Sequence, residues 1–180
     1  LCGAFCAESR RFGRAARMAT DALAGLPPIV VGLVVYVAVV LPTRRHSVLA
    51  GALALAFIAL PIVVRGTDTL LVLTPKALGD VATSLGLPRW RVVAFALLPA
   101  VARGVVATSS VAVGRALGET APLLLTSFQS SDLPRGPLDA TSTLPVAIWQ
   151  EASAPDRATR AHAWSAALVL LGVAALLHVL

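Results

Sequence analysis

Long apolar runs alternate with short polar segments along the chain. Residues 22–42 and 48–64 carry no charge, and residues 162–180 carry only histidines as titratable groups. A longer apolar region covers residues 92–128, where a few charged residues interrupt it. About 20 residues of α-helix cross a bilayer, and continuous apolar runs favour helices over barrel strands. The pattern predicts an all-α integral membrane protein with about four complete transmembrane helices, at approximately 22–42, 48–64, 100–125 and 162–180.

The composition supports a membrane protein and excludes several other classes. Of the 180 residues, 57% are hydrophobic and 13% are charged, whereas soluble domains carry roughly 25% charged residues. A disordered chain, a coiled coil and a disulfide scaffold do not fit so apolar a sequence with 2 cysteines. Both ends lie inside apolar stretches. We therefore expect residues 1–180 to be a single transmembrane domain, truncated at its N-terminus.

The positive charge has the distribution of a membrane protein. The net charge is +6, but the basic residues form short clusters between the apolar runs, as in membrane proteins. This pattern argues against nucleic-acid binding. Cys2 and Cys6 lie one helical turn apart without further cysteines or clustered histidines, so we expect no metal site and no structural disulfide. We also expect no cofactor, because no catalytic constellation or phosphate-binding GxxxxGK[ST] loop is present.

The loop cations predict an orientation. Residues 8–21 contain four arginines, and residues 65–91 contain four further Lys and Arg residues. Five basic residues fall on the opposite side of the predicted spans. Because cytoplasmic loops are enriched in Lys and Arg, we expect residues 65–99 to form a cytoplasmic loop and residues 129–161 to form an extracytoplasmic loop.

The loop 65–99 contains a helix with a clear stop signal. The segment Pro75 to Leu85 is predicted to be helical and to end at Gly86, with Pro88 blocking its continuation. Leu98-Pro99 precedes the third span, and we expect Pro99 to occupy the first turn, where its missing N–H is tolerated.

Three charged residues interrupt the third apolar region. Arg115 and Glu119 are four residues apart, so we expect them to lie on one helix face and to pair. Ionisable residues inside an apolar helix indicate a functional site, although such a pair can also serve only to reduce the cost of both charges. We expect Arg103, one turn after Pro99, to lie near the cytoplasmic end and to extend towards the headgroups.

The spacing from residue 80 to residue 99 carries a family resemblance. Asp80-Val81-Ala82 is followed after three residues by Gly86, after nine more by Ala96, and after one more by Leu98-Pro99. These intervals resemble the EAA loop of binding-protein-dependent ABC importer permeases, with the pattern EAA, three residues, G, nine residues, I, one residue, LP. Asp, Val and Ala replace Glu, Ala and Ile. The resemblance implies short cytoplasmic helices that dock on an ATPase subunit, with these coupling residues: Asp80, Val81, Ala82, Gly86, Leu98 and Pro99.

A second stretch narrows the resemblance. Residues 114–124 read GRALGETAPLL and resemble the ARALGETAPLL stretch of phosphate importer permeases of the PstA type. Residues 24–33 are similar to that family's AGVPSIVVGL segment, and residues 143–149 and 163–170 also match it in order. The resemblance implies a type I (MetI-like) helical bundle with interfacial coupling helices.

The resemblance implies a function and a set of partners. We expect one of two permease subunits of an ATP-driven inorganic phosphate importer in the bacterial inner membrane. The implied partners are a homologous PstC-type permease, ABC ATPase subunits that hydrolyse ATP in trans, and a periplasmic or lipid-anchored phosphate-binding protein. The chain itself is then not an enzyme.

The implied substrate path is centred on the charged stretch. In this hypothesis Arg115 donates two parallel hydrogen bonds to phosphate oxygens, Glu119 holds Arg115 until substrate competes, and Thr120 lies beside them. Two alternatives stay open. One is a permease for another oxyanion, such as sulfate, molybdate or tungstate, and the other is a non-transporting remnant or assembly protein.

Overall fold

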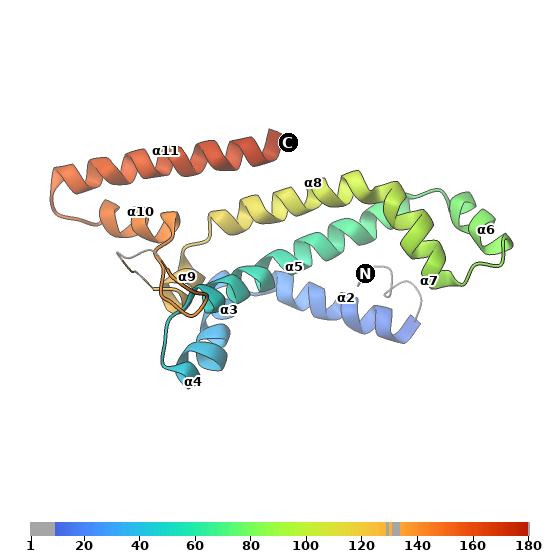
Figure 1. The fold of residues 1–180 in the computed structure, drawn as a ribbon, viewed down its shortest axis with the longest axis horizontal. Helices are drawn as coiled ribbons and strands as arrows, with labels where there is room; N and C mark the ends of the chain where they lie inside the picture. The colour runs from blue at the N-terminus through green and yellow to red at the C-terminus, as the bar shows by residue number, and fades with distance from the viewer. Residues whose placement is uncertain (1–9, 129, 131–133, 180) are drawn as a thin grey trace. The chain divides into compact units, whose positions relative to one another are not determined.

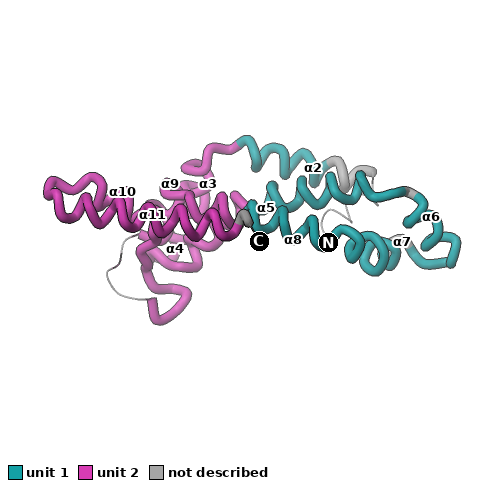
Figure 2. Tube along the Cα trace, turned by 90° about the horizontal axis from the view of Figure 1, so that it is seen from above, with its two compact units in different colours: residues 1–25, 60–112 teal, residues 26–59, 113–180 magenta. Residues whose placement is uncertain are grey.

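The structure is a computed structural model that describes residues 10–128, 130 and 134–179. Every regular element in this part of the chain is helical (Figure 1), which confirms the all-α prediction. The chain forms two compact units, coloured separately in Figure 2. Unit 1 comprises Leu1–Gly25 and Leu60–Ala112, and unit 2 comprises Leu26–Ala59 and Val113–Leu180.

Unit 1 is built around the second half of helix α5 and the first part of α8. Its described elements are α2 (Arg10–Gly25), α5 (Val48–Leu73) from residue 60 onwards, α6 (Lys76–Ser84), α7 (Arg89–Arg91), η2 (Val92–Leu97) and α8 (Leu98–Leu117) as far as residue 112. Two glycines let α5 and α8 approach closely. A Cβ on Gly104 would lie 2.7 Å from Leu70 Cδ1, and one on Gly66 would overlap the Thr108 side chain. Small residues at such contacts are typical of membrane helix pairs.

Unit 2 holds the remaining elements. They are α3 (Pro28–Val35), η1 (Tyr36–Val40), α4 (Leu41–Thr43), the first part of α5, the end of α8, α9 (Ala121–Thr126), α10 (Leu144–Ala152) and α11 (Arg157–Val179). Buried Val35 and Val40 pack with Ala50 and Ala54 into an apolar cluster, so the first two apolar segments of the sequence contact each other. Helix α3 also packs against α9, and α10 packs against α11.

The start of α5 is satisfied by polar groups from its own turn and from a distant loop. Ser47 Oγ accepts the N–H of Ala50 at 3.1 Å. The Ser47 N–H donates to the Thr126 carbonyl at 3.1 Å, and the Val48 N–H donates to the Asp139 carbonyl at 2.8 Å. The first N–H groups of a helix lack partners within the helix. These contacts therefore hold Thr126 and Asp139 against the N-terminus of α5.

Helix α11 begins with a side-chain cap. The carboxylate of Asp156 accepts the N–H of Thr159 at 2.8 Å, as an N-cap residue does. Hydrogen bonds from the side chain and the backbone of Thr159 hold the pKa of Asp156 below its ordinary value of 3.8, with a smaller contribution from His162. The predicted span 162–180 is thus part of a longer helix whose described bounds are Arg157–Val179.

Among the residues that the structure describes, three helices are long and apolar enough to cross a membrane: Val48–Leu73, Val92–Leu117 and Arg157–Leu177. A fourth is reached if the two helices that flank the break at residues 26–27 form one span. The predicted span 22–42 is therefore not one continuous helix. Pro28 disfavours helical backbone at the preceding residue, and Pro27 adopts φ −58° and ψ 136°. Pro28 then starts α3, a position that suits proline.

The helix ends of the second and third spans also differ from the prediction. Helix α5 continues to Leu73, so residues 65–73 are helical and do not belong to a loop. Helix α8 ends at Leu117, and α9 begins only at Ala121, so the predicted span 100–125 is interrupted. Pro122 explains the interruption, because it lacks an N–H for residue 118 and its ring would clash with that carbonyl.

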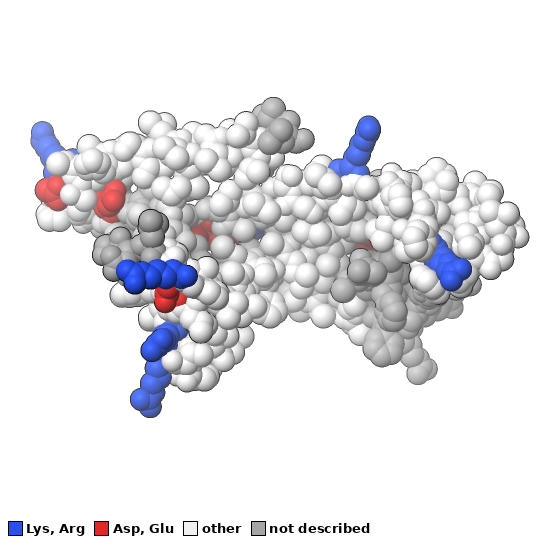
Figure 3. All heavy atoms as spheres, in the orientation of Figure 1, with Lys and Arg blue, Asp and Glu red and all other residues white. Residues whose placement is uncertain are grey.

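Apolar side chains cover much of the exposed surface. Leu73, Phe95, Trp164 and Leu168 are each at least 68% exposed. The face shown in Figure 3 is mostly free of charged atoms. Soluble monomers rarely expose contiguous apolar surface on this scale. Within the described part of the chain, the surface is that of helices that meet lipid or other membrane helices.

Candidate functional site

The predicted coupling segment forms an exposed helix with one buried face. Val81 on α6 is 61% exposed and Asp80 is also exposed, whereas Ala82 is 7% exposed. Helix α6 packs against η2, where Val92 is 4% exposed. Ala82 therefore lies on the inner face of α6, and Asp80 and Val81 are accessible to a partner.

Gly86 ends this helix as the sequence predicts. Its φ is +76°, a left-handed conformation that favours glycine. The Gly86 N–H donates to the Thr83 carbonyl at 3.0 Å, and the Leu85 N–H donates to the Val81 carbonyl at 3.3 Å. Because nothing lies within 4 Å of a Cβ built on Gly86, the backbone angle and not crowding explains the glycine. The turn sets the direction in which the chain leaves the coupling helix.

Leu98 and Pro99 lie inside a helix and not at its start. The helical backbone begins at Arg89, where the Pro88 carbonyl accepts the N–H groups of Arg91 and Val92 at 2.9 and 3.2 Å. The prediction that Pro99 lies in the first turn is therefore wrong. The π-helical segment η2 directly precedes Leu98 and Pro99. Its wider turn gives room for the proline ring, which would otherwise clash with the carbonyl four residues earlier.

The predicted substrate-path residues surround the end of α8. Arg115 Nε lies 3.7 Å from Glu119 Oε1, and the two side chains are 57% and 16% exposed. The predicted pair is present, but Glu119 lies beyond the last residue of α8. The Gly118 and Glu119 N–H groups donate to the Arg115 and Ala116 carbonyls at 3.1 and 3.2 Å. This turn, and not a continuous helix face, brings the carboxylate back to the guanidinium.

Thr120 connects this turn to a buried helix. Its carbonyl accepts the Leu124 N–H at 3.1 Å, and its side chain makes no capping hydrogen bond. In the following helix Leu123 is 3% exposed and Thr126 is fully buried. A Cβ on Gly32 would lie 2.6 Å from Pro122 Cα, so α3 contacts the start of α9 closely. The Glu119 turn is thus anchored on one side by a tightly packed helix.

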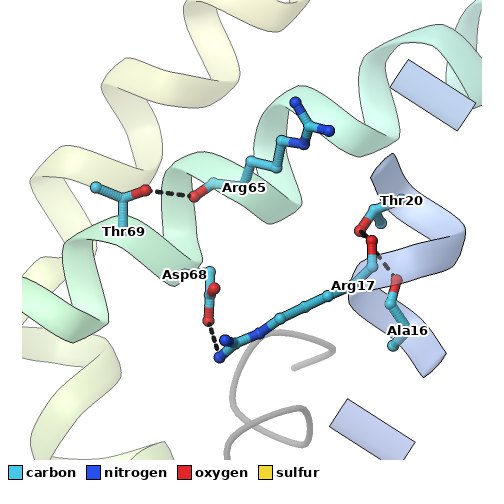
Figure 4. Close-up of polar contacts among 6 residues, drawn as sticks. All are labelled: Ala16, Arg17, Thr20, Arg65, Asp68 and Thr69. Atoms are coloured by element: carbon cyan, nitrogen blue, oxygen red, sulfur yellow. Dashed lines mark hydrogen bonds and ion pairs between the residues drawn. The ribbon is translucent and has the colours of Figure 1, made fainter. Parts of the chain in front are cut away.

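Two ion pairs that no pattern in the sequence predicts join α2 to α5. Arg17 Nη2 lies 3.1 Å from Asp68 Oδ1, and Arg65 Nη2 lies 2.6 Å from Asp21 Oδ1. Each helix supplies one cation and one anion, and Figure 4 shows the Arg17–Asp68 contact. The residues surround an open cavity of about 290 Å³. No short-range spacing could reveal these pairs, because their members are 51 and 44 residues apart.

The ion pairs place two predicted cytoplasmic segments together. Arg17 belongs to the basic segment before the first apolar run, and Arg65 follows the second run. The positive-inside pattern predicts that both arginines lie on one side of the membrane. Each of them pairs with an aspartate of the other helix, Arg17 with Asp68 and Arg65 with Asp21. The contacts bring the two segments together within unit 1, and their orientation in the membrane stays a prediction.

No group of three His, Cys, Asp or Glu side chains that could hold a metal ion occurs among the described residues. Cys2 and Cys6 lie outside the described residues, so the structure does not test the expectation for them. Trp90 makes a cation–π contact with Arg91, whose Cζ lies 5.1 Å from the ring centroid. Such aromatic and cationic pairs are common at membrane interfaces.

Comparison with known proteins agrees with the motifs. Residues 1–180 match the family "Binding-protein-dependent transport system inner membrane component". The chain is 41% identical over 155 residues to the phosphate transport system permease protein PstA of Xylella fastidiosa (strain Temecula1), covering 86% of this chain and 54% of that protein. It is 36% identical over 186 residues to the protein of the same name from Pasteurella multocida, covering 99% of this chain and 65% of that protein.

The protein of the same name from Yersinia pestis is 37% identical over 187 residues, with coverage of 100% of this chain and 62% of that protein. The chain thus spans between 54% and 65% of the length of these curated relatives. Its all-helical architecture and candidate membrane spans fit the family match. The chain belongs to the family of binding-protein-dependent transport system inner membrane components.

Proposed function

We propose that this chain is part of a membrane permease subunit of an ATP-driven inorganic phosphate importer. The observation that carries the proposal is the Arg115–Glu119 ion pair, which lies in the stretch that resembles PstA-type permeases. Arg115 is more than half exposed, and its contact with Glu119 measures 3.7 Å. Charged groups in apolar helices of membrane proteins commonly mark the path of a substrate or ion.

Arg115 acts in this proposal as the residue that receives the anion. A guanidinium donates parallel hydrogen bonds to two phosphate oxygens. Glu119, 16% exposed, holds the guanidinium in position until phosphate competes for it. Thr120 has a side chain free of any capping bond, so its hydroxyl is available to the same anion.

The exposed face of α6 is the docking element for the ATPase. Asp80 and Val81 are accessible, and Ala82 holds α6 against the chain. Gly86 sets the angle between α6 and the helix that contains Leu98 and Pro99. A push on α6 is therefore transmitted to α8 through α6–η2 packing. ATP hydrolysis takes place in ABC ATPase subunits, one of which binds at this face.

Two further partners complete the transporter. A homologous permease of the PstC type forms the other side of the translocation path, and the two permeases alternate access by rocking against each other. A periplasmic or lipid-anchored binding protein delivers phosphate to the outer face. Residues 129–161 include α10, which packs on α11, and they provide that outer surface.

Site-specific cross-linking tests the docking face. Val81→Cys, with 61% of the native side chain exposed, is expected to form a cross-link to the ATPase subunit in the assembled complex. The control is Leu138→Cys, 56% exposed in the native chain and predicted to lie on the outer side. Equal cross-linking at both positions, or none at Val81→Cys, would reject this docking face.

Uptake by cells tests the function itself. Cells that lack the gene for this protein are expected to lose high-affinity phosphate uptake and to regain it when the full-length gene is restored. Uptake of sulfate, molybdate and tungstate is measured in the same cells. Unchanged phosphate uptake contradicts the proposal, and loss of another oxyanion alone identifies that oxyanion as the substrate. No effect on any of them favours an assembly protein or a remnant.

A further inference from the structure

Arg103 lies near the middle of a candidate membrane span. The helix Val92–Leu117 is long and apolar enough to cross a membrane, and Arg103 is eleven residues from its start and fourteen from its end. The prediction that Arg103 lies near the cytoplasmic end assumed that the helix starts at Pro99, whereas its helical backbone begins at Arg89. With a rise of about 1.5 Å per residue, Arg103 is about 16 to 21 Å from either end of the span.

The guanidinium of Arg103 is not neutralised within the described part of the chain. Its side chain is exposed, and no ion pair or hydrogen bond joins it to another described residue. The carboxylates of Asp68 and Asp21 in unit 1 are engaged by Arg17 and Arg65. An unpaired cation at this depth is costly in lipid and is expected to face a protein interior or a water-filled path.

The side of α8 that carries Arg103 differs from the neighbouring side. Positions 103, 107, 110 and 114 follow one another along one side of the helix and hold Arg, Ala, Ser and Gly. The adjacent side carries the bulky Val106 and Val113, 65% and 48% exposed. The side with the two exposed valines is compatible with contact to lipid chains. The side with small and polar residues is compatible with lining a water-filled translocation path.

A third side of α8 is already occupied. Gly104 and Thr108 contact α5 through Leu70 and Gly66. The small, polar side through Arg103 is therefore not needed for packing within unit 1. Positions 103, 107, 110 and 114 on this side of α8 hold no acidic residue that could neutralise Arg103.

We propose that Arg103 is a second oxyanion-binding residue on the translocation path, deeper towards the cytoplasmic end of α8 than Arg115. This proposal rests on the proposed function. The two arginines are about 18 Å apart along the helix and about a third of a turn apart around it. One phosphate does not touch both at once, so the anion passes from Arg115 to Arg103. Each guanidinium offers the same paired donors to phosphate oxygens.

The test uses the complete transporter, reconstituted with its ATPase and binding protein. Arg103→Gln is expected to lower phosphate uptake at least about tenfold, the loss of one charge-assisted hydrogen-bonded contact, at an unchanged yield of assembled complex. Arg103→Lys keeps the charge and is expected to retain more uptake than Arg103→Gln. The control is Arg45→Gln, an exposed cation in the link between α4 and α5.

A chemical rescue separates substrate binding from pairing with a partner subunit. Arg103→Cys, in a background with Cys2 and Cys6 replaced by Ser, is treated with a cationic or a neutral methanethiosulfonate. The cationic reagent is expected to restore uptake several-fold and the neutral reagent is not. Added phosphate is expected to slow the modification at residue 103 but not at Arg45→Cys.

The outcomes are distinct. Wild-type uptake by Arg103→Gln overturns the inference and leaves the proposed function standing. Loss of complex assembly in Arg103→Gln, with modification of Arg103→Cys insensitive to phosphate, also overturns it and assigns Arg103 to a carboxylate of the partner permease. If the wild-type complex transports a different oxyanion, the proposed function fails. Protection of residue 103 by that oxyanion then supports the inference.

Discussion

Arginines in two regions of this protein have opposite surroundings. Between α2 and α5, Arg17 and Arg65 each meet an aspartate of the other helix at 3.1 and 2.6 Å. On α8, Arg115 has one contact at 3.7 Å, and Arg103 has no partner in the described part of the chain. The first region joins two helices, whereas the second holds one arginine in a local pair and one without a partner among the described residues.

The difference shows how the same residue type serves two purposes. The α2–α5 pairs use residues that are distant in sequence, so they hold the tertiary structure. The Arg115–Glu119 pair uses residues within one turn of chain, so it adds little to the tertiary structure. A locally paired or unpaired arginine can exchange its partner without breaking the fold. Substitutions in the two regions should therefore affect different measurements.

The largest expected effect is on transport at Arg115. We expect Arg115→Gln to lower phosphate uptake by the reconstituted transporter by about tenfold to a hundredfold, because hydrogen bonds to charged groups contribute about 1.5–3 kcal/mol. The yield of assembled complex should stay unchanged. Arg115→Lys keeps the charge but loses the paired donors, so phosphate uptake with this variant should lie between that of the wild type and that of Arg115→Gln.

The matched control for Arg115 is Arg17→Gln, which removes an equally exposed guanidinium from the other region. It should leave the concentration of phosphate at half-maximal uptake unchanged. If Arg17→Gln and Arg115→Gln reduce phosphate uptake equally, Arg115 has no role in transport that distinguishes it from an arginine that joins two helices.

A smaller effect is expected on stability at the α2–α5 pairs. We expect Arg17→Asp to destabilise unit 1 by repulsion from Asp68, and the double substitution Arg17→Asp with Asp68→Arg to recover most of the loss. The coupling free energy should be about 0.2–1 kcal/mol, the range of solvent-accessible ion pairs. Thermal unfolding of the purified protein in detergent gives this value through a double-mutant cycle.

Additive effects of the two substitutions, with no recovery in the double variant, would mean that Arg17 and Asp68 do not interact. The same cycle on Arg115 and Glu119 is expected to give a smaller coupling in stability. That contrast sharpens the comparison, because it separates pairs that join helices from a pair within one turn.

The smallest effect concerns a charge that acts only on its own helix. The lowered pKa of Asp156 means that its ionised form stabilises the start of α11. This stabilisation is present above the ordinary pKa and is lost as the pH falls through the folded value. We expect the rate of amide hydrogen exchange at residues 157–160 in the wild type, divided by the rate in Asp156→Asn at the same pH, to be higher at about pH 3 than at about pH 6. An unchanged ratio would contradict the role of the carboxylate.

Much of the local structure could be predicted from sequence. Gly86 follows α6 with a positive φ, which glycine adopts without steric cost, and Pro88 prevents the helix from continuing. The Arg115–Glu119 contact is predicted from a spacing of four residues, although a turn and not a helix face closes it. These features depend on neighbours in sequence, which periodicity and stop signals describe well.

The predicted helix bounds differ from the structure where prolines interrupt the helical backbone or where charged residues contact distant parts of the chain. Pro28 breaks the first predicted span at Pro27, and Pro122 interrupts the third, although apolar composition alone indicates continuous helices. Pro99 lies within a helix because the π-helical turn before it provides room. Helix α5 continues past Arg65 and Asp68, and both of these residues pair with α2. Those contacts cannot be read from the segment that contains them.

In the proposed function, phosphate passes the arginines of α8. The most direct measurement is ATP-driven accumulation of radiolabelled phosphate and sulfate in proteoliposomes that contain the complete transporter, with the wild-type chain or with Arg115→Gln. We expect ATP-dependent accumulation of phosphate but not sulfate by the wild type, and accumulation of phosphate about tenfold to a hundredfold lower with Arg115→Gln at equal complex content. Equal accumulation of phosphate by both proteins, or preference of the wild type for sulfate, would contradict the proposed function.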